Sequence, residues 1–391
     1  MPEARANANW FTYFPEDYRW SAAICGMLSG ARFGQSEIGE IDQVGRRLRE
    51  KLGDDEHWFN EWKWMGDRVR ALGQAAEKKK NGLSAASHYL RACSYYQMGE
   101  RFRTPKDKRA LDVFKASLDC FRRFVRLTDR PRIEQVEIPY ERGKKLPAYF
   151  VRAENTKKAK APCVVFFDGL DVTKELQYMR GVDDLVRRGM SCLIVDGPGT
   201  GESIRFRKIY LRHDYEAAGS AAMDYLEKRR DVDANRVAVM AISLGGYYAP
   251  RVASMEPRFK ACVAWGAIWD YHETWKKRVE ASFKTELSVP GHHITWILNA
   301  KSLDEALKML EPYRLDGVVQ KMRCPFLITH GEDDKQQPLH YAQSLYKASG
   351  SKDKTLKVFT VEEGGAQHCQ RDNLSIGTAY MFDWLKEKLR A

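Results

Sequence analysis

A succession of short, almost uninterrupted apolar segments dominates the chain from residue 163 onward. Strands that are covered on both faces of a parallel sheet have this character, because neither face alternates with water-facing side chains. Helical spacing fills most of the intervals, at 172–188, 214–230, 244–254 and 337–348. Strands that alternate with helices predict an α/β fold with a mostly parallel, doubly wound sheet. The apolar segments are Cys163–Phe167, Ser191–Val195, Val237–Met240, Ala261–Trp265, Pro325–Thr329 and Leu356–Val361.

The remaining parts of the chain predict further units. Residues 1–130 show helical spacing without strand signals, which predicts a helical N-terminal domain ahead of an α/β domain over 131–391. Alternation over 133–138 and a second strand over 146–151 predict an antiparallel hairpin. The interval at about 266–323 is too long for a simple crossover, and we expect a helical insertion that acts as a lid.

Composition excludes several classes of function. The longest apolar runs have six to eight residues, too few to span a membrane, and the N-terminus lacks the apolar core of a signal peptide. The eight cysteines show no paired spacing, so we expect a cytoplasmic protein. The net charge of +12 is spread among acidic residues, and no nucleic-acid-binding motif is present. We therefore expect neither a nucleic acid nor a membrane as partner.

Ser243 follows directly on one of the apolar segments. The stretch Val237-Ala-Val-Met-Ala-Ile-Ser-Leu-Gly-Gly246 passes from a strand into a turn of small residues and then into a helix. This is the layout of a nucleophile elbow, Gly-x-Ser-x-Gly, which lifts a serine Oγ above a parallel sheet. Ala241 stands in place of the first glycine, while Gly245 keeps the second.

An acid and a histidine follow Ser243 along the chain. Asp333 and Asp334 come after the next-to-last strand, and His368 comes after the last one. The order Ser, Asp, His is that of the α/β-hydrolases. A serine hydroxyl needs a neighbouring base, so we predict that Ser243 is the nucleophile and His368 the base. The His-Gly-x-x-Asp pattern that begins at His330 favours Asp334 over Asp333 as the acid.

An oxyanion hole requires two preorganised backbone N–H donors. We expect Leu244 to supply one of them, because it follows the nucleophile at a helix N-terminus. Gly169 or Leu170, in the loop after the first parallel strand, would supply the other. Four more side chains are candidates for assisting proton transfer, or else belong to the surface or to turns: Asp270, His272, Glu273 and Asp333.

Neither a cofactor nor a metal is expected. The segment from Asp196 to Ser203 is rich in glycine, but Glu202 stands where the third glycine of a dinucleotide-binding loop would be. We expect this segment to be a structural loop beside the active site. The adjacent residues His292 and His293 do not converge on one helical face, and no metalloprotease or paired-cysteine motif accompanies them.

These motifs together resemble one group of α/β-hydrolases that has a large helical N-terminal region. The group includes 2,6-dihydroxypseudooxynicotine hydrolase and the fungal pigment-pathway hydrolases that shorten polyketide chains. The resemblance covers residues 130–391 by motif, and the N-terminal part by helical character and position. The motifs that carry it are Asp168–Asp171, Asp196–Ser203, Ser243–Tyr248 and Gly365–Cys369.

The resemblance implies a serine hydrolase that cleaves a carbon–carbon bond next to a ketone. Its substrate would be a small aromatic or polyketide-like molecule, and the helical region would form a homodimer contact. A carboxylesterase or lactonase is the alternative, because the same triad also cleaves esters. An alternative of another class is a non-catalytic regulatory protein on a hydrolase scaffold.

Overall fold

The computed structural model describes residues 10–104, 106–284 and 287–391, which belong to two compact units. One unit comprises Met1–Arg132 together with Leu287–His293, and the other comprises Ile133–Glu286 and Ile294–Ala391. Residues 1–7, the N-terminal segment in which we found no apolar core of a signal peptide, lie outside the described residues. Within the described residues, no helix is long and apolar enough to cross a membrane.

The second unit is built on a single sheet. Its strands are β1 (Ile133–Pro139), β2 (Lys145–Val151), β3 (Ala161–Phe167), β4 (Ser191–Val195), β5 (Val232–Ile242), β6 (Ala261–Trp265), β7 (Phe326–Gly331) and β8 (Lys354–Phe359). They follow the order β1-β2-β4-β3-β5-β6-β7-β8. β1 and β2 form the predicted antiparallel hairpin, and β2 also pairs antiparallel with β4. The other neighbouring strands are parallel, so the predicted doubly wound, mostly parallel sheet is confirmed.

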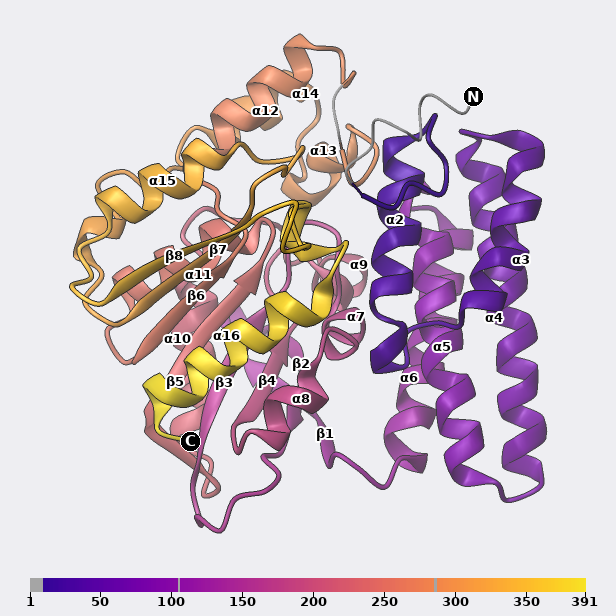
Figure 1. Ribbon diagram of the computed structural model, residues 1–391, viewed down its shortest axis with the longest axis horizontal. Coiled ribbons are helices and arrows are strands. Elements are labelled where there is room, and N and C mark those ends of the chain that lie inside the picture. The colour runs from indigo at the N-terminus through magenta and orange to yellow at the C-terminus, as the bar shows by residue number, and fades with distance from the viewer. Residues whose placement is uncertain (1–9, 105, 285–286) are drawn as a thin grey trace. The chain divides into compact units, whose positions relative to one another are not determined.

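Helices cover both faces of the sheet, which explains the uninterrupted apolar character of its central strands. α8 (Val182–Arg187) and α16 (Leu374–Leu389) lie on one face, and α10 (Glu216–Glu227) and α11 (Gly245–Met255) lie on the other (Figure 1). Every residue of β3, β4 and β6 is buried. These strands bring their carboxyl ends to one edge of the sheet, where the loops that follow them meet.

Two expectations need correction. The stretch 172–188 is divided into α7 (Lys174–Tyr178) and α8, because Gly181 between them adopts a left-handed conformation with φ of +92°. The glycine-rich segment after β4 is a loop only as far as Thr200, because its last three residues begin the short helix α9 (Gly201–Arg207). The interval between β6 and β7 is helical as predicted, with α12 (Tyr271–Glu280), α13 (His293–Leu298) and α14 (Leu303–Leu310).

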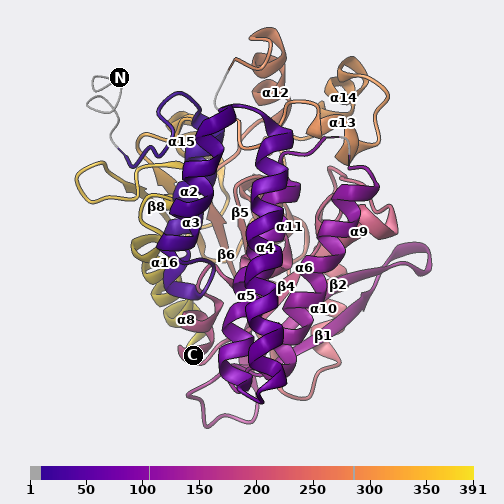
Figure 2. The ribbon, with the colours of Figure 1, turned by 90° about the vertical axis from the view of Figure 1, so that its right-hand side faces the viewer.

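The first unit consists of helices, and its described residues contain no strand, as predicted. The main helices are α2 (Tyr18–Ser29), α3 (Ile38–Leu48), α4 (Asp55–Lys78), α5 (Gly82–Arg101) and α6 (Lys108–Leu127). Figure 2 shows α4, α5 and α6 running alongside one another. Buried aromatic rings form their core: Trp58 lies 4.9 Å from Trp20, 5.6 Å from Trp62 and 4.8 Å from Phe102 between ring centroids.

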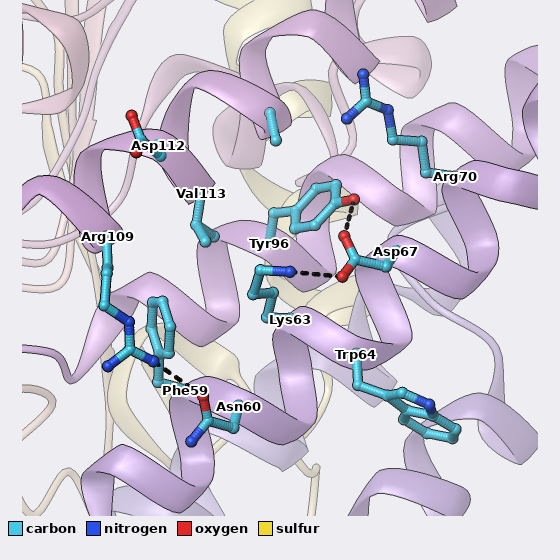
Figure 3. Close-up of a pocket in the computed structure, with 11 residues that line it drawn as sticks. Phe59, Asn60, Lys63, Trp64, Asp67, Arg70, Tyr96, Arg109, Asp112 and Val113 are labelled. Carbon is cyan, nitrogen blue, oxygen red and sulfur yellow. Dashed lines mark hydrogen bonds and ion pairs between the residues drawn. The ribbon is translucent and has the colours of Figure 1, made fainter.

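A groove of about 630 Å³ lies in this unit, lined by residues of α4, α5 and α6 (Figure 3). Its lining combines the aromatic rings of Phe59, Trp64 and Tyr96 with charged side chains. Lys63 Nζ lies 2.6 Å from Asp67 Oδ2, and the Tyr96 hydroxyl donates to Asp67 Oδ1 at 2.7 Å. These pairs join side chains of α4 to each other and to α5.

Two glycines allow α4 and α5 to pack closely. A Cβ at Gly66 would lie 2.7 Å from the ring of Tyr96, and a Cβ at Gly73 would lie 2.9 Å from the ring of Tyr89. The two glycines are separated by seven residues, so they lie on the same face of α4. The tyrosine rings of α5 therefore rest directly on the α4 backbone.

The substitution Gly66→Ala should destabilise the protein although alanine is the better helix former. Overpacking against the Tyr96 ring is expected to lower the free energy of unfolding by about 1–3 kcal/mol, measured by urea denaturation. Gly39→Ala is the matched control, because Gly39 lies exposed in α3 with no atom within 4 Å of a new Cβ. It should stabilise by at most about 1 kcal/mol. Equal effects of the two substitutions would contradict the packing argument.

Candidate active site

Ser243 occupies a sharp turn between β5 and α11. Its φ is +60°, a left-handed conformation that is uncommon for residues other than glycine. The Ser243 N–H donates to the carbonyl of Trp265 at the end of β6, at 2.8 Å. This turn from a central strand into a helix N-terminus has the geometry of a nucleophile elbow.

The small residues around the elbow are required by backbone crowding. A Cβ at Gly246 would lie 1.9 Å from the carbonyl oxygen of Gly266. A Cβ at Gly245 would lie 2.4 Å from the Cβ of Ala241. Alanine is accommodated at the first small position because Gly245 has no side chain. The departure from Gly-x-Ser-x-Gly is therefore compatible with the turn.

The three residues predicted for the triad are connected by hydrogen bonds. His368 Nε2 lies 2.8 Å from Ser243 Oγ, and His368 Nδ1 lies 2.7 Å from Asp334 Oδ2. The backbone N–H groups of Gln336 and Gln337 donate to Asp334 Oδ1, at 2.8 and 3.0 Å. These two bonds fix the carboxylate and leave its other oxygen for the histidine.

The charges of Asp334 and His368 support each other. Burial alone would raise the pKa of Asp334, but the charge and hydrogen bond of His368 lower that pKa to about 2. Burial alone would lower the pKa of His368, but Asp334 raises it above the ordinary range of histidine. An ionised Asp334 thus increases the affinity of His368 for a proton, which is what a general base requires.

Asp333 lies in a different environment. Its carboxylate forms an ion pair with Lys335 and accepts a hydrogen bond from Gln367 Nε2 at 2.9 Å. The geometry therefore brings Asp334, the residue favoured by the His-Gly-x-x-Asp pattern, to His368.

The loop after β3 lies directly against the elbow. A Cβ at Gly169 would be 3.0 Å from Ser243 Cβ and 2.8 Å from the carbonyl oxygen of Ile242. The same position lies 3.6 Å from the backbone nitrogen of Leu244. Gly169 thus lies beside Ser243 from the loop after β3, and Leu244 follows Ser243 directly in the chain. Leu170 is the next residue of the loop after Gly169. Their role as N–H donors to an oxyanion stays a prediction.

His330, which the sequence analysis named only as the start of the His-Gly-x-x-Asp pattern, has a structural role. The Ala267 N–H donates to His330 Nδ1 at 3.2 Å, so Nε2 carries the proton and donates to the carbonyl of Gln337 at 3.1 Å. Burial lowers the pKa of His330, which keeps the ring neutral. The ring joins the loop after β6 to the loop that carries Asp334.

The accessory candidates at the start of α12 have partners outside the triad. Asp270 caps the helix by accepting the Glu273 N–H at 2.8 Å, and its other oxygen pairs with Arg314 Nε at 3.0 Å. Arg314 also donates to His272 Nδ1 at 3.3 Å, while Glu273 pairs with Lys277 at 3.3 Å. No described interaction connects these residues to Ser243 or His368, and an accessory role stays a prediction.

Among the residues that the structure describes, no three or more His, Cys, Asp or Glu side chains are grouped to hold a metal ion.

Asp168 is a buried carboxyl group at the end of β3. Neither of its side-chain oxygens has a hydrogen-bond donor among the described residues, and the side chain is fully buried. Burial and the neighbouring Asp196 raise the pKa of Asp168 well above its ordinary value. The folded environment therefore favours the protonated, uncharged form of this carboxyl group.

Known proteins resemble this chain over almost its full length. A family described as Esterase FrsA-like matches residues 53–390. Hydrolase LUC6 of Fusarium sp is 30% identical, and the alignment covers 92% of this chain and 94% of LUC6. The 20-hydroxy-prefusarin hydrolase FUS2 of Gibberella moniliformis is 28% identical, with coverage of 92% and 94%.

A solved structure shows the same architecture. The crystal structure of 2,6-dihydroxy-pseudo-oxynicotine hydrolase has a TM-score of 0.76 and 23% identity to this chain. The alignment covers 93% of this chain and 95% of that one. The likeness confirms the fold that the strand and helix pattern predicted.

The raised pKa of Asp168 predicts how the free energy of unfolding depends on pH. The folded state keeps a proton that an unfolded aspartate loses above about pH 4, so the free energy of unfolding falls as pH rises toward the folded pKa. Asp168→Asn keeps the size and removes the titration. Relative to the parent protein, the variant should gain up to about 1.4 kcal/mol per pH unit over the range between the ordinary aspartate pKa and the raised pKa of the folded state, measured by urea denaturation. Asp129→Asn, at an exposed position, is the control. A gain for Asp168→Asn no larger than that of the control would contradict the raised pKa of Asp168.

Proposed function

Because this chain belongs to the Esterase FrsA-like family of α/β-hydrolases, we propose that it is a serine hydrolase with Ser243, His368 and Asp334 as its triad. Its membership also confirms the resemblance that the motifs indicated. The observation that supports the proposal most directly is the unbroken line of hydrogen bonds from Ser243 Oγ through His368 to Asp334, at 2.8 and 2.7 Å.

The proposed reaction follows from the hydrogen bonds that connect Ser243, His368 and Asp334. His368 Nε2 accepts the proton of Ser243 Oγ while the oxygen attacks a substrate carbonyl. The N–H groups of Leu244 and of Gly169 or Leu170 bind the resulting oxyanion. The tetrahedral intermediate collapses to an acyl-serine, and the leaving group takes the proton from His368. Water, deprotonated by the same histidine, then hydrolyses the acyl-serine.

We propose that the bond cleaved is a carbon–carbon bond next to a ketone. In a 1,3-dicarbonyl compound, the electron pair of the broken bond is delocalised into the second carbonyl as an enolate, which His368 protonates. The name of the relative FUS2, a 20-hydroxy-prefusarin hydrolase, supports a polyketide-like substrate class.

The resemblance supports an aromatic or polyketide-like substrate. Buried aromatic rings connect the helix after Ser243 to the insertion between β6 and β7. Tyr248, five residues after Ser243 in α11, stacks on Tyr215 with ring centroids 3.7 Å apart. Tyr247 lies 5.4 Å from Tyr313, which lies in the insertion between β6 and β7. We propose that this insertion, at about 266–323, acts as a lid that covers the substrate and excludes water. The catalytic domain would then span 131–391, after a helical domain over 1–130.

A carboxylesterase or lactonase is the second candidate. The family description, an esterase, favours it, and an ester differs from the 1,3-dicarbonyl only in its leaving group. Pocket contacts to the leaving group decide between the two reactions.

We further propose a cytoplasmic homodimer. All eight cysteines are free thiols, and only Cys324 is not fully buried, which is compatible with a reducing compartment. The homodimer follows from the resemblance, with the helical unit as the contact.

Replacing the nucleophile tests the function. Ser243→Ala should abolish hydrolysis, with a loss of at least about 10⁴-fold in kcat, while the thermal unfolding temperature stays unchanged. The assay should compare product formation from an aryl 1,3-diketone and from an aryl ester of similar size. Cleavage of the diketone supports the carbon–carbon hydrolase, and cleavage of the ester alone supports the esterase.

Labelling by a fluorophosphonate provides the independent control. The parent protein should be labelled at Ser243, and the Ser243→Ala variant should not be. Turnover by the variant, or absence of labelling in the parent, would contradict the triad and favour the non-catalytic alternative.

The two adjacent aspartates can be distinguished by kinetics. Asp334→Asn should lower kcat by roughly 10³- to 10⁴-fold, because the histidine loses its orienting carboxylate. It should also move the acid limb of the kcat/KM profile to lower pH, since the charge of Asp334 raises the pKa of His368. The matched control Asp333→Asn should stay within a few-fold of the parent. The reverse outcome would assign the acid to Asp333.

A further inference from the structure

A cluster of charged side chains is buried beneath the loop that carries Gly169. Lys174, the first residue of α7, has a fully buried side chain whose Nζ contacts three carboxylates. The distances are 2.9 Å to Asp196 Oδ2, 2.6 Å to Glu202 Oε1 and 2.8 Å to Glu175 Oε1. The Tyr149 hydroxyl on β2 donates to Glu175 Oε1 at 3.0 Å. One lysine thus joins groups from β2, α7, α9 and the end of β4.

Asp196 connects this lysine to the backbone of two loops. Its Oδ1 accepts the backbone N–H of Lys174 at 2.9 Å, and its Oδ2 accepts the backbone N–H of Glu202 at 2.8 Å. The Ser203 hydroxyl donates to the Asp196 carbonyl at 2.6 Å. A Cβ at Gly201 would lie 2.0 Å from the Asp196 carboxyl carbon, so glycine is needed for this approach. The start of α7 and the start of α9 are therefore held to the end of β4.

The loop 168–173 is anchored at both ends. At its beginning, Gln177 Nε2 in α7 donates to the carbonyl of Phe167, the last residue of β3, at 3.2 Å. At its end, Lys174 is held by Asp196 through both its backbone N–H and its ammonium group. Between these anchors, Gly169 lies against Ser243 and leaves no room for a Cβ.

Such a cluster is not explained by stability alone. Removing four ionisable groups from water is energetically unfavourable, and apolar residues of similar volume often give equal or greater stability. Fixed geometry is the property that buried charges supply and apolar contacts do not, because each hydrogen bond specifies a distance and a direction. Here the geometry is specified at the end of a loop whose position matters within a few tenths of an ångström.

We propose that Lys174 is a positioning residue for the oxyanion hole. Its bonds to Asp196, Glu202 and Glu175 hold the loop 168–173 so that an N–H of Gly169 or Leu170 points at the oxyanion formed on attack by Ser243. This inference rests on the proposed serine hydrolase function. It assigns a role in the reaction to a lysine that does not itself touch the substrate.

The experiment uses the full-length protein and two covalent probes of the serine. One is a fluorophosphonate, and the other is its thiono analogue, in which sulfur replaces the phosphoryl oxygen. Sulfur is the weaker hydrogen-bond acceptor, so the ratio of the two labelling rates reports the oxyanion-hole donors. Lys174→Met keeps the length of the side chain and removes its charge. It should slow labelling by the fluorophosphonate roughly 10- to 100-fold and labelling by the thiono analogue much less. The ratio of the fluorophosphonate rate to the thiono rate should therefore fall.

Lys106→Met is the matched control. The side chain of Lys106 is 3% exposed in the helical unit, where its Nζ lies 3.1 Å from Glu100 Oε1. This substitution removes a buried lysine of similar exposure, so it should lower the unfolding temperature and leave the ratio of labelling rates unchanged. Labelling is measured well below the unfolding temperature of each variant, which separates positioning from loss of folded protein.

A second variant keeps the test decisive if Lys174→Met does not fold. Glu202→Gln preserves shape and an acceptor oxygen but removes one charge bound by Lys174. It should lower the ratio of labelling rates roughly threefold to tenfold, a smaller change than Lys174→Met. A folded Glu202→Gln or Lys174→Met protein with the parent ratio, or with both rates reduced equally, would overturn the proposal.

The failure of this inference can be distinguished from the failure of the proposed function. If the parent protein is not labelled at Ser243, the serine hydrolase itself is wrong. If labelling requires Ser243 but its ratio does not depend on Lys174 or Glu202, only the positioning role is wrong.

Discussion

The close approach of backbone at the end of β5 is the constraint on which the rest of the site depends. Ser243 is held in a left-handed conformation, and its N–H is bound to the carbonyl of Trp265. The turn leaves no space for side chains at Gly245, Gly246 or, across the neighbouring loop, Gly169. Because the backbone is so tightly packed there, the direction of the Cα–Cβ bond of Ser243 is fixed by the turn itself.

Two sets of buried charges surround this turn, and they act in different ways. The Asp334–His368 pair changes the proton affinity of the histidine whose Nε2 lies 2.8 Å from Ser243 Oγ. The Lys174 cluster contacts neither Ser243 nor His368 in the described interactions, and its effect is exerted on backbone geometry. Neutral hydrogen bonds through His330 complete the framework, because they tie the Asp334 loop to the end of β6.

The sequence predicted the elements whose signal is local. The eight strands lie at or within a few residues of the predicted segments, and Ser243, Asp334 and His368 are brought together as their motifs implied. The break between α7 and α8 was missed because the helical spacing continues across Gly181, whose left-handed conformation is a tertiary feature.

The Lys174 cluster was missed for another reason. Lys174 is separated from Asp196 by 22 residues and from Glu202 by 28, and charged residues beside glycines are typical of exposed loops. Only the topology, which places β3 beside β4, brings the ends of these loops together and buries their charges.

The contact between Ala241 and Gly245 has a consequence for how such sites are recognised. A Cβ at residue 245 would meet the Cβ of residue 241 at 2.4 Å, so the turn has room for a single methyl group shared between the two positions. The steric rule concerns the pair of residues and not each residue separately. A search that demands glycine at both positions would overlook this serine, whereas one that allows either position a methyl group, but not both, would find it.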